Sequence, residues 1–207
     1  MKKNPPFPLS PRRGLPHVGW CMTCLQSPTP DRLDSCLAAW AEAPLSYRHA
    51  GGVAHRPAQG FLVDHHEIRL GSGSEAYQRA AGALDAWRMF PHWGCVARTR
   101  YTGQTPGDVV AMVVRLAGLW WINPCRILQR LDSPASHGFV YGTLPEHAEC
   151  GEEAFIVEHR GDNSVWYVIH AFSKPRHPLA WIGFPVARWW QLRFVRDSQQ
   201  RMVEATA

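Results

Sequence analysis

The close succession of strand-like segments between residues 93 and 172 constrains the fold of this chain more than any other feature. Six runs rich in β-branched and aromatic residues are separated only by short turn-forming segments. The runs are Trp93–Tyr101, Asp108–Leu116, Cys125–Leu131, Gly138–Leu144, Glu153–His159 and Val165–Phe172. Because a parallel connection needs a crossover of a dozen or more residues, this spacing predicts an antiparallel meander. Residues 120–124 are compatible with either a bulge or a turn.

One further strand and two helices are predicted ahead of the meander. Phe61–Leu70 is typical of a strand. A short helix is expected over Asp31–Ala41, with Asp31 as its N-cap. A second helix is expected over Ser74–Phe90, where Ser74 can cap the first turn and Pro91 ends the last one.

The hydrophobic period changes to that of a helix at the end of the chain. Between Pro178 and Val203 the apolar residues recur at helical spacing, which predicts a long amphipathic helix kinked near Gly183 and Pro185. Such a helix must bury its apolar face, and the concave side of a curved sheet is the natural place. The element order therefore predicts an α+β helix-grip fold, in which a seven-stranded antiparallel sheet wraps around the C-terminal helix.

The segment Gly138–Phe155, with the sequence GFVYGTLPEHAECGEEAF, is richer in polar groups than a hairpin requires. Side chains alternate along a strand, so Tyr141 and Thr143 share one face with His137 and Phe139, whereas Glu152 and Glu153 point to opposite faces. A buried carboxylate needs a partner, and Arg126 is the predicted partner of Glu153. Three interpretations stay open.

In the first interpretation Glu153, Arg126 and Tyr141 form a satisfied polar network that fixes the register of the sheet. Replacing Glu153 with glutamine would then destabilise the fold. In the second interpretation the same groups form the polar end of an apolar cavity and orient the head group of a ligand. Acid/base catalysis by these groups is a third, narrower alternative.

Four ordered motifs resemble those of the DUF1990 (UPF0548) family. They are Trp87–Phe90 with Trp93, Asn123–Ile127, Gly138–Phe155 and Ala171–Leu179. The likeness covers about residues 30–203 and implies a START-like, Bet v 1-like helix-grip fold. It implies no particular substrate or catalytic residue.

The fold and the resemblance together favour a protein that binds an apolar or amphipathic small molecule between the sheet and the last helix. The predicted ligand-binding residues are Arg126, Tyr141, Thr143, Glu153, Phe155, Trp166, Val186 and Trp189, with Val110, Met112, Val114 and Ile182 as further walls. A cyclase or dehydratase that uses the same cavity is the alternative, with Tyr141, Glu153 and His170 as candidate catalytic residues. His170 is otherwise a hydrogen-bonded core residue. A third alternative is a filled core and a final helix that contacts a membrane surface or another protein.

Charge and composition separate the first 29 residues from the rest. The net charge is +5, but residues 1–29 contribute four Lys and Arg and no acid, so the remainder carries only +1. This balance argues against a nucleic-acid partner. The segment is also rich in proline, and we expect a poorly ordered basic extension over 1–29 followed by a single domain over 30–207. The oligomeric state cannot be predicted from the sequence.

The remaining motifs favour ordinary structural roles. The six cysteines, including the Cys21-x-x-Cys24 pair, are expected to be free thiols in a cytoplasmic protein, because the chain starts without a secretory signal. His147, Glu149 and Cys150 lie in one loop, but a second ligand pair at metal-site spacing is missing, so we predict no metal. No phosphate-binding glycine loop or nucleophile elbow is present, and we predict no cofactor.

Overall fold

A curved antiparallel sheet dominates the computed structural model, which describes residues 23–48, 50–51, 60–93, 95–99, 104–116, 118–176 and 184–207. Its main strands are β2 (Leu62–Ser72), β3 (Cys95–Thr99), β4 (Val109–Leu116), β5 (Leu119–Ser133), β6 (Ser136–Thr143), β7 (Glu149–His159) and β8 (Ser164–Pro175). They pair in the order β2-β8-β7-β6-β5-β4-β3, and each pair is antiparallel. The predicted seven-stranded sheet is therefore confirmed.

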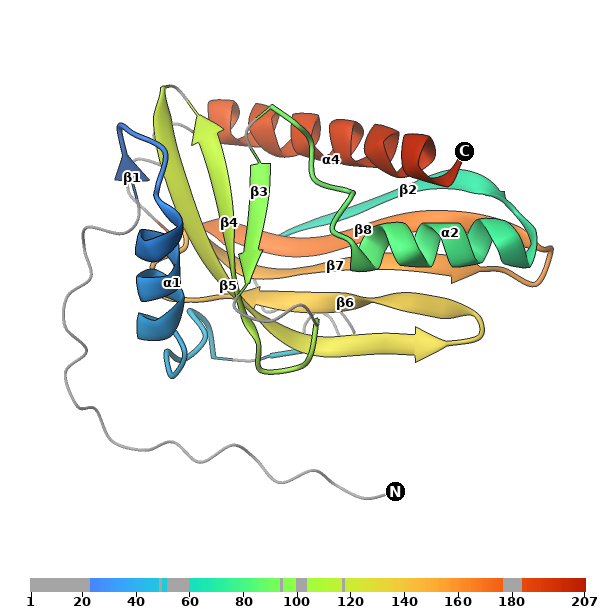
Figure 1. The fold of residues 1–207 in the computed structure, drawn as a ribbon, viewed down its shortest axis with the longest axis horizontal. Coiled ribbons are helices and arrows are strands. Elements are labelled where there is room, and N and C mark those ends of the chain that lie inside the picture. Colours follow the sequence, from blue (N-terminus) through green and yellow to red (C-terminus); the bar gives the residue numbers. More distant parts are fainter. Residues whose placement is uncertain are drawn as a thin grey trace, which may run out of the picture.

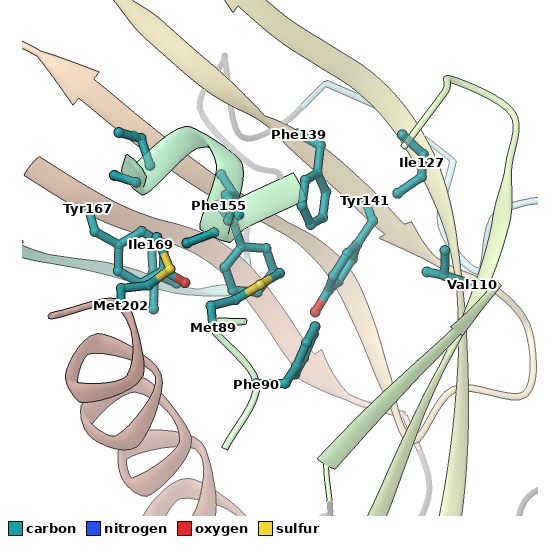
Figure 2. Packing of buried hydrophobic residues seen from close by; sticks show 14 of the residues in the cluster. Met89, Phe90, Val110, Ile127, Phe139, Tyr141, Phe155, Tyr167, Ile169 and Met202 are labelled. Carbon is teal, nitrogen blue, oxygen red and sulfur yellow. The ribbon is translucent and has the colours of Figure 1, made fainter. Parts of the chain in front are cut away.

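Two helices cover the concave face of this sheet. Figure 1 shows α2 (Gly73–Asp85) and α4 (Phe184–Thr206) lying on the same side of the strands. Leu84 from α2 and Met202 from α4 are fully buried against inward-facing side chains such as Phe155 and Tyr167. Figure 2 shows these aromatic side chains rising from the strands toward the helices. The sheet grips the C-terminal helix, as the helix-grip prediction requires.

A third helix lies against the opposite, convex face. In α1 (Pro30–Ala39) the buried side chains of Leu33, Cys36 and Leu37 pack against outward-facing residues of β4 and β5. Both faces of the central strands are thus apolar and covered. For this reason hydrophobicity alone does not tell which face of a strand looks into the concave side.

The helix boundaries differ from the sequence-based expectations for local reasons. The N-cap of α1 is Thr29 rather than Asp31, because the Thr29 hydroxyl accepts a hydrogen bond from the backbone N–H of Arg32 at 3.3 Å. Ser74 is not a cap, since α2 already begins at Gly73. The helix ends at Asp85, before Pro91, and the following Trp87 has a positive φ of 56° that no α-helix accommodates.

The sheet contains one irregularity that matters for the site. Residues 120–124 continue β5 as regular strand, so the bulge or turn considered there is absent. The register instead shifts between Ile127 and Gln129, where Leu128 has no partner on β6. A bulge of this kind reverses the alternation of inward and outward side chains along the strand.

Arg126 lies outside the concave side and binds the turn after α1 instead of Glu153. Its guanidinium donates hydrogen bonds to the carbonyl oxygens of Ala43 at 2.7 Å, Trp40 at 3.1 Å and Ala41 at 2.6 Å. It thereby supplies charged donors to the carbonyl groups of the turn that follows α1. The predicted Arg126–Glu153 pair is therefore wrong.

We expect Arg126→Met to lower the free energy of unfolding by about 2 kcal/mol, because half-buried carbonyls lose charge-assisted donors while the aliphatic stem is kept. Urea denaturation measures the change. Arg69→Met removes an exposed guanidinium with a single long hydrogen bond and serves as the control. Equal midpoints for the two variants would show that the hydrogen bonds of Arg126 to the turn after α1 do not stabilise the fold.

The N-terminal region is described only from residue 23 onward. β1 (Thr23–Cys24) pairs with Trp121 and Trp120 of β5, and Cys21 and residues 1–20 lie outside the described residues. The domain boundary at 29/30 stays a prediction.

Cys24, Cys125 and Cys150 are free thiols, but Cys36 takes part in a disulfide bond, so the expectation of free thiols fails there. No helix in the described part of the chain is long and apolar enough to cross a membrane.

Candidate ligand cavity between the sheet and the C-terminal helix

A cavity of about 490 Å³ lies between the concave face of the sheet and the first half of α4. Strands β2, β4, β5, β6, β7 and β8 contribute inward-facing side chains to it, and α4 contributes residues between 186 and 195. Val186 and Leu192 both line the cavity and are exposed to solvent. The cavity therefore opens beside the N-terminal half of this helix.

Tyr141 and Glu153 form the first polar element of the cavity. They lie directly opposite each other on β6 and β7, and the Tyr141 hydroxyl donates a hydrogen bond of 2.5 Å to Glu153 Oε2. Burial raises the pKa of Glu153 from its ordinary 4.5 to about 7, the Tyr141 hydrogen bond lowers it, and the charges of Glu149 and Asp64 raise it further. The carboxyl group is thus a proton donor or acceptor near neutral pH.

An ion pair between β2 and α4 forms the second polar element. Both oxygens of Asp64 accept hydrogen bonds from Arg188, Nη1 and Nη2 each at 2.5 Å. This fork-to-fork geometry fixes α4 against the edge strand. His66 lines the cavity beside the pair, with Nε2 at 3.8 Å from Asp64 Oδ1 and without a hydrogen-bond partner within the described ranges.

The third polar element comes from the start of β7 and the loop before it. Glu149 accepts a 2.5 Å hydrogen bond from Gln191 of α4, and burial raises the pKa of its carboxyl group. His147 accepts a hydrogen bond at Nδ1 from the Glu149 backbone N–H at 2.9 Å. Burial lowers the pKa of His147 to about 4, so its ring is neutral at physiological pH.

Aromatic side chains make up much of the remaining wall. Phe90, Trp93, Trp121, Trp190 and Phe194 all line the cavity. Trp93 and Trp190 pack with ring centroids 5.3 Å apart, and Trp93 is fixed by a 2.7 Å hydrogen bond to Asp197. In Figure 2 the hydroxyl end of Tyr141 points toward Phe90, where the aromatic wall meets the polar end.

The structure brings together part of the predicted ligand-binding set. Tyr141, Thr143 and Glu153 line the cavity from adjacent strands, and Val186 lines it from α4. Met112 and Val114 of β4 complete the predicted walls, while Ile182 lies outside the described residues. A ligand contact by any of them stays a prediction.

The other predicted residues lie elsewhere. Phe155 and Val110 are fully buried core residues beneath the aromatic cluster and do not reach the cavity. Trp166 is on the convex face, where its indole packs against Arg160 at 4.5 Å. Trp189 is 56% exposed, and its neighbour Trp190 faces the cavity instead.

His170 also lies on the convex face. Its ring packs against that of His65 with centroids 5.5 Å apart, and its register partners are Ala154 and His65. The candidate catalytic role of His170 in the cavity is therefore wrong. Tyr141 and Glu153 are the two candidates that the geometry keeps.

Several residues of the cavity were missed by the sequence analysis. Asp64 and His66 share one strand face with the partly buried Ile68 and Leu70, and this period of two indicates their inward orientation. The sequence predicts a loop around Glu149, but this residue begins β7. Arg188 pairs with Asp64, which is 124 positions away, and no local sequence pattern predicts that contact.

Within the described ranges, no group of three or more His, Cys, Asp or Glu side chains is arranged to hold a metal ion. The acidic groups of the cavity are instead hydrogen-bonded to neutral or cationic side chains. The cavity thus combines proton donors and acceptors with an aromatic wall.

Comparison with known proteins identifies the family. The family model described as "Domain of unknown function (DUF1990)" matches residues 46–201, which include every cavity residue named above. The chain belongs to the DUF1990 family. The resemblance read from the four sequence motifs is thereby confirmed.

Individual DUF1990 relatives support the assignment. A UPF0548 protein of Deinococcus radiodurans is 31% identical over 197 residues, covering 89% of this chain and 98% of that protein. A UPF0548 protein of Dictyostelium discoideum is 33% identical over 157 residues, covering 70% of this chain and 73% of the relative. Among solved structures, the hypothetical protein jhp0584 of Helicobacter pylori has a TM-score of 0.55 at 10% identity, covering 77% of this chain and 95% of that one. At that identity the likeness shows the fold alone.

Proposed function

We propose that this DUF1990 protein binds an amphipathic small molecule in the cavity between the sheet and α4. The observation that carries the proposal is the cavity itself, which combines about 490 Å³ with an aromatic wall and a cluster of buried polar groups. Small-molecule sites typically measure about 300–1,000 Å³ and pair an apolar lining with a few placed polar groups.

Two unpartnered polar atoms support a ligand with polar substituents. Trp121 Nε1 and His66 Nε2 are buried, line the cavity and have no hydrogen-bond partner in the part of the chain that the structure describes. Leaving such an atom without a partner costs about 1–3 kcal/mol. A ligand that hydrogen-bonds to them would recover this energy, which an aliphatic filling of the cavity would not.

Native mass spectrometry of the purified protein, followed by solvent extraction, tests the proposal directly. We expect a bound organic molecule whose mass is lost on denaturation. If the native mass equals the chain mass, a fluorescent apolar dye provides the second measurement. Failure of the dye to bind saturably would overturn the proposal.

Ala171→Phe is expected to weaken this binding strongly. Ala171 lies on β8 opposite both Glu153 and Asp64 and lines the cavity, so a phenyl ring there occupies the space beside the polar end. Dye titration should show at least a tenfold loss of affinity, with an unchanged circular dichroism spectrum. The matched control is Ala38→Phe on the exposed face of α1. Equal affinities in the two variants would place the binding site elsewhere.

An enzymatic function is the second candidate, and the Tyr141–Glu153 pair favours it. A carboxyl group with a pKa of about 7, hydrogen-bonded to a phenol at a cavity wall, meets the requirement for a general acid or base at neutral pH. The test is turnover of the extracted compound. Tyr141→Phe should abolish turnover while binding persists, and a compound recovered unchanged after prolonged incubation would argue against catalysis.

A further inference from the structure

The cavity holds more acidic than basic groups. Asp64, Glu149 and Glu153 face it from β2 and β7, and Arg188 is the one Lys or Arg side chain among the described residues that line it. Glu152 also borders the cavity, but its carboxylate accepts hydrogen bonds from Tyr47 and the Gly51 N–H on the convex side. Among the described residues, the titratable groups around Glu153 are Tyr141, Tyr167, Cys125, Glu149, Asp64, His66, His147 and Arg188.

The single positive charge of Arg188 is directed mainly at Asp64 and cannot balance all three acids. Its two terminal nitrogens are engaged by the two oxygens of Asp64, each at 2.5 Å. Among the described residues, the charge of Arg188 lowers the pKa of Glu149 only as a lesser effect, and Glu153 has no cation as a hydrogen-bond partner. An anionic head group, such as that of a fatty acid, would have to approach these carboxyl groups without a free positive charge to receive it.

The hydrogen-bond partners of Glu149 and Glu153 are neutral. Glu149 accepts hydrogen bonds from the side chains of Gln191 and Ser173, and Glu153 accepts one from the Tyr141 hydroxyl. The two carboxyl groups also repel each other, because the charge of Glu149 disfavours ionisation of Glu153. His147 supplies no charge, since its ring is neutral at physiological pH.

The aromatic walls near Glu149 and Glu153 fit an organic cation better than a hydrated metal ion. Trp121, Phe90 and Tyr141 line the same cavity, and aromatic faces attract ammonium groups by cation–π interaction. The described residues do not provide a metal cluster. An alkylammonium group joined to an apolar body would match the carboxyl pair and the aromatic wall at once.

We propose that the ligand of this cavity carries a protonated amine or a quaternary ammonium group, held by Glu149 and Glu153, with its apolar body against the aromatic wall. The inference rests on the proposed small-molecule binding and names the chemical class of the ligand. It predicts that affinity depends on the charge of the ligand, which the proposed binding of an amphipathic molecule does not by itself predict.

A matched series of probes tests it on the ligand-free protein. The series comprises 4-phenylbutyltrimethylammonium, its uncharged carbon isostere and 5-phenylvalerate as the anion. Fluorescence of Trp93, Trp121 and Trp190, which line the cavity, reports saturation. We expect the quaternary ammonium probe to bind at least tenfold more tightly than the isostere at pH 8.5, and the anion to bind most weakly.

The pH dependence gives a second, independent readout. The ammonium probe does not titrate, so any change reflects the protein. Because Glu153 must release its proton to pair with the cation and its pKa is about 7, affinity should fall by about thirtyfold between pH 8.5 and 5.5. The isostere should show no such change.

Variants assign the effect to the two carboxyl groups. Glu153→Gln and Glu149→Gln should each reduce the preference for the cation, and Glu153→Gln should also flatten the pH profile. Glu158→Gln, at a carboxylate of β7 that pairs with Arg160, is the control and should change neither. Equal binding of cation and isostere, or preference for the anion, would overturn the charge assignment and leave the cavity as a binding site. Failure of all three probes and of the apolar dye would overturn both proposals.

Discussion

Gly151→Ala is expected to lower the free energy of unfolding by more than about 4 kcal/mol, or to prevent folding altogether. Gly151 pairs with Ser173 across β7 and β8, and a Cβ at this position would lie 1.9 Å from the Phe172 carbonyl oxygen. The obstacle is backbone in the interior of the sheet, which cannot move aside as a flexible side chain can. Urea denaturation, or the yield of folded protein where the variant precipitates, measures the effect.

Gly161→Ala is the matched control. Gly161 lies in the turn between β7 and β8, and a Cβ there would have no heavy atom within 4 Å. We expect this variant to change stability by no more than about 0.5 kcal/mol. A Gly151→Ala protein with the same denaturation midpoint as Gly161→Ala would show that β7 and β8 do not approach as closely as described.

Lack of space for a Cβ atom also explains why glycine occupies two other positions in the segment 138–155. A Cβ on Gly138 would lie 2.1 Å from the Phe155 carbonyl oxygen, and a Cβ on Gly142 would lie 2.2 Å from the Tyr47 hydroxyl. That hydroxyl donates to Glu152, which is 2% exposed. One part of the family motif thus serves close packing on the convex side, while Tyr141 and Glu153 face the cavity.

The period of two correctly predicted on which faces of the strands many side chains lie, because side chains alternate along any regular strand. Glu152 and Glu153 do point to opposite faces, as do His65 and His66. The order of elements was also sufficient to predict the sheet and the helix that it grips. These features depend on local sequence and on the short connections between strands.

The assignment of Arg126 could not be obtained in this way. Arg130 on the same strand contacts Asp85 and His137 on the concave side, and counting back by two would place Arg126 there as well. The bulge at Leu128 reverses the alternation, so Arg126 faces α1. A register shift arises from pairing with the neighbouring strand and has no signature in the composition of β5.

The sequence also does not show which face of β8 borders the cavity, for a different reason. Alternation along the strand puts Trp166, Val168, His170 and Phe172 on one face, but that face is as apolar as the opposite one. Phe172 packs against Phe61 and Tyr47 on the convex side, with centroids 5.2 and 6.1 Å away. Because both faces are covered, only the tertiary structure shows which of them borders the cavity.

Glu153→Gln is expected to stabilise the ligand-free protein at pH 8 by about 3 kcal/mol, the reverse of the effect expected from an Arg126 partner. The pKa of Glu153 is raised from 4.5 to about 7 in the folded protein, chiefly by burial. Folding therefore favours the protonated form. The stability linked to this group is fully present below pH 4.5, falls as the pH rises toward 7, and stays low above it.

Glutamine is neutral throughout this range and can still accept the Tyr141 hydrogen bond. The two proteins should therefore have similar stability at pH 4 and diverge progressively up to pH 7, as followed by urea denaturation at each pH. Glu152→Gln, on the opposite face, is the control and should bring no gain at pH 8, because it weakens the acceptor of Tyr47 and Gly51. Loss of stability in Glu153→Gln at pH 8 would mean that a cationic group already balances the ionised carboxylate.

The same measurement connects stability to the proposed ligand. The ionised Glu153 carboxylate destabilises the empty protein above pH 7, and a bound ammonium group would remove that penalty by pairing with it. At pH 8 the quaternary ammonium probe should therefore raise the melting temperature of the parent protein more than that of Glu153→Gln, whereas the uncharged isostere should raise both equally. An equal shift with the cation would contradict the pairing, because the probe would then gain nothing from the charge at residue 153.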